Sequence, residues 1–444
     1  MPRKSKIDLL NAINPSNAGL GASVLMYDRI NPAFQEYKYA RRQIYSNFLK
    51  TMPDSIEEDE AVNDIEDAEL LRSSYMAIHS HRNDRNKWAE RFTQISRKLY
   101  GEPDPSLATS LLTEELRFAK SLINDQYVSQ KAVKLLIDTF SPIVETGLKN
   151  YGYYSAPIIS DHATYAIRHY GSFVQRRYRP IFDLVDLSNK ASFSTRDLFV
   201  LFDSALNWMK QNDDPDWCKW KVVISNGTSV YVVVRKKQIN IGSRRGRVTI
   251  QEAKGLLAHE LLVHAMRGKN GYKTGNRMLA IGLPGYLHSE EGLGVLHEMA
   301  VNNNLPDKAR DRYLDIALAL GTIDGVERPR SQLFRLTYAR HLTRAQALNH
   351  DPQVINDIKP RVWAHIDRIY RGGKGFGRAS QQAVFTKDII YFDGFIAMSD
   401  YIVRRIYKGD LPEVIFNYLS SAKFDPNNPR HTRLISQDID NYVQ

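Results

Sequence analysis

Cysteine and long apolar runs are what this sequence lacks most clearly. Its 444 residues contain one cysteine, Cys218, which excludes an internal disulfide framework and favours a reducing compartment. No run of about 18 consecutive apolar residues occurs, so we expect no segment that spans a membrane. The N-terminus is basic, but Asn and Pro interrupt the apolar stretch after it, which argues against a secretory signal peptide. We therefore expect a cytoplasmic protein.

Positive charge is in excess, with a formal net charge of +11. Apolar residues make up 43% and charged residues 25%, as in ordinary soluble proteins, and the length is enough for more than one domain. The charge is compatible with nucleic acid, anionic lipid or an acidic polypeptide as a partner, or with a basic surface that has no specific partner. No helix-turn-helix, zinc-finger or RNP-like string is present, which disfavours direct recognition of nucleic acid.

Helical periodicity covers most of the chain, with one β-rich interval after Trp217. Asn226-Gly227 lies between two runs rich in Val and aromatic residues, 219–225 and 228–236, and this pattern predicts a β-hairpin. A third strand is expected at 238–242, immediately before a helix that runs from about residue 249 to 267. Since helical patterns resume beyond it, we predict a predominantly helical α+β fold with a small β-sheet next to that helix.

That helix carries the residues that point to chemistry, which are His259, Glu260 and His264. Zinc binds imidazole and carboxylate ligands, and a Glu beside the first ligand can act as general base. The familiar spacing is His-Glu-x-x-His, whereas here three residues separate Glu260 from His264. Five residues of regular helix advance about 500°, which leaves the two imidazoles about 140° apart. We therefore predict a π-type turn between them, without which they are buried core histidines.

A third ligand is expected from the segment 287–300, one loop and one helix start downstream. A His-Glu helix followed by a Glu on a second helix is the arrangement of thermolysin-like sites. Because neighbouring residues on a helix point in different directions, only one of two adjacent glutamates can face the ion. The candidates in the segment are Glu290, Glu291, His297 and Glu298.

Four motifs in order extend the pattern: HELLVHAMRGKNG from His259, EEGLG from Glu290, YRGG from Tyr370 and FTKDIIYFDGF from Phe385. Together they resemble the family named for its QEGLA motif, over roughly residues 31–419. Its animal members are the microtubule-associated tyrosine carboxypeptidases, and its bacterial members have been labelled flavohemoglobin expression-modulating proteins. Two departures are visible, since Glu290 replaces Gln and Gly294 replaces Ala, and neither removes a ligand.

The resemblance implies a zinc carboxypeptidase with a thermolysin-like active site. It implies that His259, His264 and Glu291 are the metal ligands and that Glu260 is the general base. An N-terminal helical region, 1–100, would precede a catalytic domain, 101–444, with the active-site core at about 217–400. The substrate would be a peptide or protein C-terminus, with a Tyr-like or acidic tail as candidate and an acidic tail attracted by the basic charge.

Further roles follow from what such an enzyme needs. Tyr391 is the candidate donor to the oxyanion, with a packed core tyrosine as the alternative. A cation must hold the terminal carboxylate, and the candidates are Lys387, Arg371 and Arg267, with structural ion pairs as the alternative. The INIG strand is expected to offer an edge to the substrate backbone. The alternative function is a catalytically silent regulatory or binding protein that uses the same fold, with an acidic or nucleic-acid partner.

Overall fold

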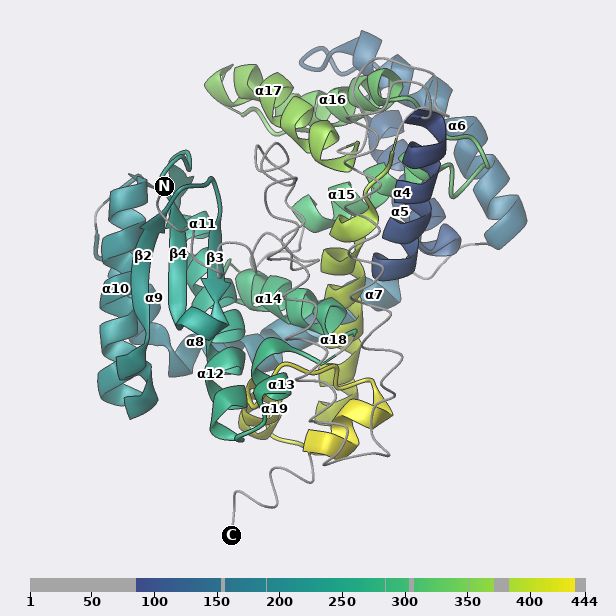
Figure 1. Cartoon of the computed structure of the whole chain (residues 1–444). Coiled ribbons are helices and arrows are strands. Elements are labelled where there is room, and N and C mark those ends of the chain that lie inside the picture. The colour runs from purple at the N-terminus through teal and green to yellow at the C-terminus, as the bar shows by residue number, and fades with distance from the viewer. Residues whose placement is uncertain are drawn as a thin grey trace.

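The structure, a computed structural model, describes residues 85–435 except 153–155, 189, 284, 303–306, 351 and 371–382. It is predominantly helical with two small sheets, which confirms the predicted α+β class (Figure 1). Most of the expected N-terminal helical region, up to residue 84, lies outside the described residues. No helix in the described part of the chain combines the length and apolarity needed to cross a membrane.

Six helices form most of one hydrophobic core, which we call the helical core. Asp104 caps the first turn of one of them by accepting a hydrogen bond from the backbone N–H of Leu107 at 2.8 Å. A buried ion-pair network joins Arg340 to Asp311 and Asp315 inside this group. The helices are α4 (Arg85–Tyr100), α5 (Pro105–Ser121), α6 (Gln130–Tyr151), α15 (Asp307–Leu320), α16 (Arg330–Ala347) and α17 (Pro352–Ile369).

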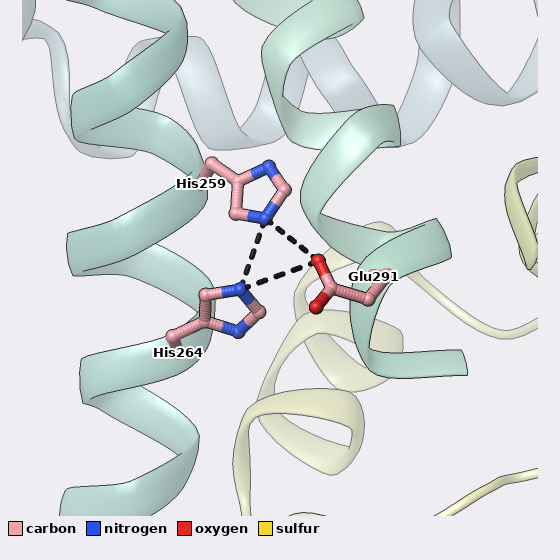
Figure 2. Close-up of side chains that lie close together, drawn as sticks. All are labelled: His259, His264 and Glu291. Carbon is pink, nitrogen blue, oxygen red and sulfur yellow. Dashed lines mark hydrogen bonds and ion pairs between the residues drawn. The ribbon is translucent and has the colours of Figure 1, made fainter. Parts of the chain in front are cut away.

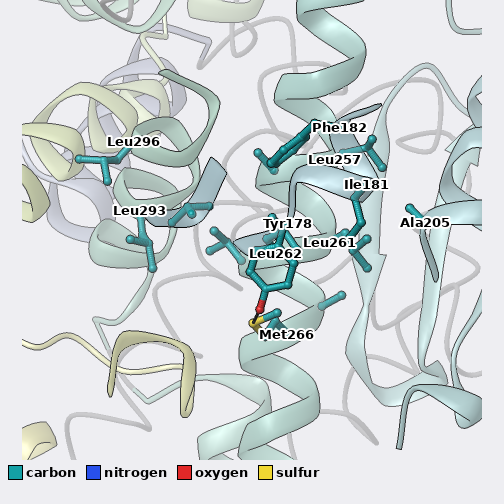
Figure 3. Close-up of a cluster of buried hydrophobic side chains, with 14 of the residues drawn as sticks. Tyr178, Ile181, Phe182, Ala205, Leu257, Leu261, Leu262, Met266, Leu293 and Leu296 are labelled. Atoms are coloured by element: carbon teal, nitrogen blue, oxygen red, sulfur yellow. Dashed lines mark hydrogen bonds between the residues drawn. The ribbon is translucent and has the colours of Figure 1, made fainter. Parts of the chain in front are cut away.

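A second core, the sheet-side core, surrounds the helix that carries the two histidines. Figure 3 shows Leu257, Leu261 and Leu262 of that helix packed near Tyr178 and Phe182. Because these apolar side chains are buried, they fix the helix in position and leave its other face to the polar residues. The flanking elements are α7 (Ala156–Ala166), the π-helix η3 (Ile167–Gly171), α8 (Ser172–Arg177), α9 (Arg179–Asp186) and α10 (Thr195–Asn212).

The three-stranded sheet has the order β2 (Lys221–Ser225), β4 (Gln238–Gly242), β3 (Val230–Val233), so the predicted hairpin across Asn226-Gly227 is wrong. β2 pairs with β4 in parallel, and β3 pairs with β4 antiparallel. The Asn-Gly turn instead crosses the end of β4, where the carbonyl of Gly227 accepts from the N–H of Arg244 at 2.8 Å. The QINIG segment, which is nearly all buried, forms the central strand of the sheet. The turn motif gave no indication of this strand order.

The strand order also changes the expectation for a substrate-binding edge. INIG belongs to β4, whose backbone is paired on both sides, so it is not an edge. β3 is an edge strand of this sheet and contacts the histidine-bearing helix. A separate two-stranded ribbon pairs β1 (Ser192–Phe193) with β5 (Val248–Thr249) and leads directly into that helix.

The histidine-bearing helix begins as α11 (Ile250–Leu256), becomes the π-helix η6 (Leu257–Ala265) and ends as α12 (Met266–Lys273). Thr249 starts it with a capping box, in which its hydroxyl accepts from the N–H of Glu252 and its own N–H donates to the Glu252 carboxylate. The short α13 (Arg277–Ile281) follows. The π-helix is the widened turn expected from the spacing of the histidines.

Two further helices cross in the middle of the molecule, α14 (Leu287–Asn302) and α18 (Ile389–Tyr407) (Figure 1). A Cβ on Gly292 would lie 2.1 Å from the carbonyl carbon of Gly394, so only glycine permits this approach. α18 continues from the helical core into the sheet-side core, and α19 (Pro412–Ser420) packs on the latter. Both crossing helices therefore bring side chains to the junction of the two cores.

Candidate metal centre

His259 and His264 face the same point because the π-helix widens the turn between them. Their Nε2 atoms lie 2.9 Å apart, as Figure 2 shows. In a regular α-helix their side chains would diverge by about 140°. Between them, Leu261, Leu262 and Val263 are buried and pack in the sheet-side core, which holds the wider turn in place.

Glu291 on α14 completes the group. Its Oε2 atom lies 3.4 Å from Nε2 of His259 and 3.7 Å from Nε2 of His264 (Figure 2). The ligand atoms of the three residues all lie within 4.8 Å of one another, and this buried group can hold a metal ion. Gly294, one turn further along α14, leaves room for the first imidazole, since a Cβ there would lie 2.6 Å from Nε2 of His259.

The hydrogen bonds at the far side of each imidazole decide which nitrogen carries the proton. Nδ1 of His259 lies 2.5 Å from Oε1 of Glu298, and Nδ1 of His264 lies 2.8 Å from Oε1 of Glu290. A carboxylate only accepts, so each Nδ1 is the donor, and a ring that is neutral turns a lone pair on Nε2 toward the other. The two Nε2 atoms and the Glu291 carboxylate then converge on one point, and this arrangement needs positive charge there, from a proton or from a metal ion. The donor set therefore fits a metal ion.

The electrostatics of the group lead to the same conclusion. Burial lowers the pKa of His259, but hydrogen bonds with Glu291 and Glu298 outweigh it and leave the pKa well above its usual value. Burial raises the pKa of Glu291, yet hydrogen bonds with both histidines, and then the charges of His264 and Lys387, hold it well below its usual value. The centre thus stabilises positive charge between an anionic carboxylate and its two imidazoles.

Glu290, beside the third member of the group, points the other way. Its Oε2 atom accepts from Nη1 of Arg267 at 2.5 Å, and its Oε1 atom pairs with the ammonium of Lys423. Arg267 also donates to the backbone carbonyls of Ala422 and Phe424, both at 2.7 Å. This guanidinium is therefore engaged on all sides by the protein, which favours a structural role over the binding of a substrate carboxylate.

Glu260 is buried next to the first histidine, and its Oε2 atom has no hydrogen-bond partner. Burial raises its pKa, while the charges of His264 and His259 act in the opposite direction. A buried carboxylate oxygen without a partner is costly, and it is common where a substrate or water completes the site. Its position suits a group that exchanges a proton at this centre.

A cationic region lies beyond Glu291, at the start of α18. Tyr391 packs against both cores, and burial first, then the charge of Glu291, raises its pKa well above the usual value. Lys387 is buried in the 3-10 turn Thr386–Asp388 (η8). Nη2 of Arg368 donates to Asp388 at 2.7 Å, and the charge of Asp388 raises the pKa of this arginine. Arg371, a candidate for the terminal carboxylate, lies outside the described residues.

Arg245, in the turn between β4 and β5, carries a cation whose charge interacts with carboxylates around the centre. Its Nε atom is buried without a partner. Burial lowers its pKa, against the opposing charges of Glu252, Glu260 and Glu298. The charge of the guanidinium therefore interacts with that of Glu260, from an element different from the one that carries Lys387.

The structure makes Glu298 a hydrogen-bond partner of His259 and not a ligand, and it brings to the centre three residues that the sequence motifs did not single out: Arg368, Lys423 and Arg245. Glu298 was one of four candidates in its segment. A spacing of seven residues from Glu291 places both on one helix face, and this spacing can be read from the sequence. His297, another candidate, points elsewhere, with its Nε2 atom 3.0 Å from the hydroxyl of Tyr170. The other three had no distinguishing local pattern.

The fold and the centre define a helical α+β domain in which a His-Glu-x-x-x-His helix and a Glu from a neighbouring helix form a metal-type group. Residues 203–417 match the family model described as microtubule-associated tyrosine carboxypeptidase. The description implies a carboxypeptidase-like role. The matched segment includes the metal-type group and Tyr391. Searches of curated proteins and of solved structures found no match.

Proposed function

We propose that the protein is a zinc-dependent carboxypeptidase, with His259, His264 and Glu291 as the metal ligands. The observation that carries the proposal is the convergence of two Nε2 atoms and one carboxylate oxygen within 4.8 Å of one another. Two imidazoles and one carboxylate are the ligand set of catalytic zinc in thermolysin and carboxypeptidase A. When bound, zinc supplies Lewis-acid activation of water and of the scissile carbonyl.

Glu260 is proposed as general base, because its buried and unpartnered Oε2 atom is free to accept a proton from the attacking water. The same carboxyl then returns the proton to the amine that leaves. Tyr391 is proposed as donor to the developing oxyanion. Because its pKa is raised well above the usual value, the phenol keeps its proton and can donate a hydrogen bond at neutral pH.

Action at the chain end requires a cation for the α-carboxylate of the last residue. Lys387 is our first candidate, because its charge acts on Glu291 from the start of α18. Arg371 stays a second candidate. Arg267 is retained only as support for Glu290, since the protein itself already occupies its donors.

The substrate backbone needs a strand beside the centre, and β3 supplies it in this proposal. It is an edge strand that contacts the π-helix, so an extended peptide can add to the sheet there. Arg245 lies near Glu260 and can attract a carboxylate on the part of the peptide that precedes the scissile bond. We infer that the substrate is a peptide or protein C-terminus with acidic residues and, following the family description, a terminal tyrosine.

The test uses two matched acidic peptides that end in tyrosine, one with a free carboxylate and one with an amide. We expect release of tyrosine from the free acid only, measured by mass spectrometry. Internal cuts, or equal cleavage of both peptides, would exclude a carboxypeptidase but leave a zinc peptidase. Lys387→Met should raise KM for the free acid while zinc content stays unchanged. Metal-containing protein that cleaves neither peptide would favour the silent binding protein.

A further inference from the structure

The residues that follow the family match contact residues next to the metal-type group. The match ends at residue 417, and the chain then continues as the segment 420–425. Its backbone is held by several parts of the site. The carbonyl of Ser420 accepts from Asn270 at 2.8 Å, and the carbonyls of Ala422 and Phe424 accept from Arg267. The hydroxyl of Ser289, the residue before Glu290, donates to the carbonyl of Phe424 at 3.0 Å.

The side chain of Lys423, in this segment, contacts Glu290, the hydrogen-bond partner of His264. Only 5% of its surface is exposed, and its ammonium pairs with Oε1 of Glu290. The same oxygen accepts the hydrogen bond from Nδ1 of His264. Its backbone is fixed as well, because its N–H donates to the carbonyl of Leu279 at 2.8 Å and its carbonyl accepts from Leu283 at 3.1 Å.

The two histidines are therefore supported differently. Glu298, the partner of His259, has 33% of its side chain exposed. Glu290, the partner of His264, has 1% exposed and meets a cation at each oxygen, Arg267 at Oε2 and Lys423 at Oε1. A buried carboxylate held at both oxygens cannot rotate, so the hydrogen bond to His264 keeps one direction.

We propose that Lys423 is a positioning residue of the metal centre, which fixes Oε1 of Glu290 and through it the imidazole of His264. The inference rests on the proposed metal function, and it extends the centre beyond the family match. Partners of metal-bound histidines typically contribute about 10–100-fold to metal affinity. Removal of the Lys423 ammonium should reduce the metal affinity by an amount within that range and not abolish binding, because Arg267 still holds the other oxygen of Glu290.

The test measures the zinc dissociation constant by competition with a chromophoric chelator, together with the melting temperature of metal-free protein. Lys423→Met and Lys423→Gln should each weaken zinc binding about 10–100-fold. The control is Lys269→Met, which removes another buried lysine that pairs with Asp214 at 2.7 Å, away from the centre. It should lower the melting temperature and leave the zinc affinity unchanged.

The outcomes separate the two proposals. Wild-type protein that binds no zinc would overturn the proposed function itself. Wild-type protein that binds zinc through His264, with unchanged affinity in both Lys423 variants, would overturn the positioning role alone. A fall in affinity no larger than that of Lys269→Met would also reject it, because the effect would then reflect general destabilisation.

Discussion

The Nε2 atoms of His259 and His264 lie 2.9 Å apart, although the two residues are five positions apart on one helix. The π-helix makes this contact possible, and Glu291 faces the same point from α14. If that point holds zinc, the loss of any member should reduce bound metal. We expect His264→Ala and Glu291→Ala to lose stoichiometric zinc in elemental analysis. His162→Ala, which removes a histidine paired with Asp400 outside the centre, should retain it.

Glu260→Gln separates metal binding from catalysis. The amide keeps the size of the side chain but cannot accept a proton from water, so kcat should fall about 10²–10⁴-fold. Zinc content should equal that of the wild type, because Glu260 is not one of the three converging residues. Steady-state kinetics with elemental analysis would check this, and full activity of the variant would remove Glu260 from its role.

Gly294→Ala introduces the alanine that the QEGLA motif carries, but in this chain it should weaken zinc binding, because the added Cβ would lie 2.6 Å from the Nε2 atom of His259. The imidazole would have to move out of the position that faces Glu291. Gly255→Ala on α11 is the control, since the nearest neighbours of its Cβ would lie 3.4 Å away, at an ordinary contact distance. Both changes replace Gly by Ala in a helix, and each gains about 1 kcal/mol or less of helix propensity. The melting temperatures of the two metal-free variants should therefore change similarly, whereas chelator competition should distinguish them.

Asp393 predicts a pH dependence of stability that is independent of the metal. The N–H of Asp104 donates to the hydroxyl of Tyr313 at 2.6 Å, and that hydroxyl is hydrogen-bonded to Asp393. Burial raises the pKa of Asp393 from 3.8 to about 7. The folded state therefore binds its proton more tightly than the unfolded state, and this stabilisation is lost as the pH rises from about 4 to 7.

Asp393→Asn should remove that loss. Relative to the wild type, its free energy of unfolding should increase between pH 5 and 8, by up to about 3 kcal/mol if the whole shift is effective. Urea unfolding at several pH values measures the difference. Asp400→Asn, which removes a more exposed carboxyl from the same helix, is the control. A constant difference between Asp393→Asn and the wild type would contradict the assignment.

Arg245→Gln should raise KM for acidic peptides more than for neutral peptides of the same length. Added salt should weaken binding of acidic peptides to the wild type and have less effect on the variant, because screening acts on the charge that has been removed. Arg244→Gln changes the neighbouring exposed arginine and should have little effect. Equal KM changes for acidic and neutral peptides would argue against the role of Arg245.

The widened turn was predictable because helix geometry is rigid, so a spacing of five residues leaves few ways to bring two imidazoles together. The place of the third residue was predictable to a segment, but the choice of Glu291 over Glu290 came from the family resemblance. The structure shows the physical reason for the difference. Glu290 and Glu291 are adjacent on α14 and point in different directions. Glu291 faces the two histidines, whereas Glu290 contacts Arg267 and Lys423.

Strand order could not be obtained in this way. Asn226-Gly227 is typical of a hairpin, but the motif describes only the turn and not which strand fills the space beside it. Lys423 was equally hidden, because 133 residues separate it from Glu290 and no local pattern marks it. Arg245 stands among several basic residues, and only the folded turn shows which of them approaches Glu260.

α18 belongs to both hydrophobic cores, and this has a consequence for how the protein unfolds. Phe392 lies in the helical core and Phe395 in the sheet-side core, less than one helical turn further on. Neither core can lose its packing without releasing the helix that completes the other. The two halves should therefore melt in a single cooperative transition, and a fragment that contains only one of them should not retain the arrangement of His259, His264 and Glu291.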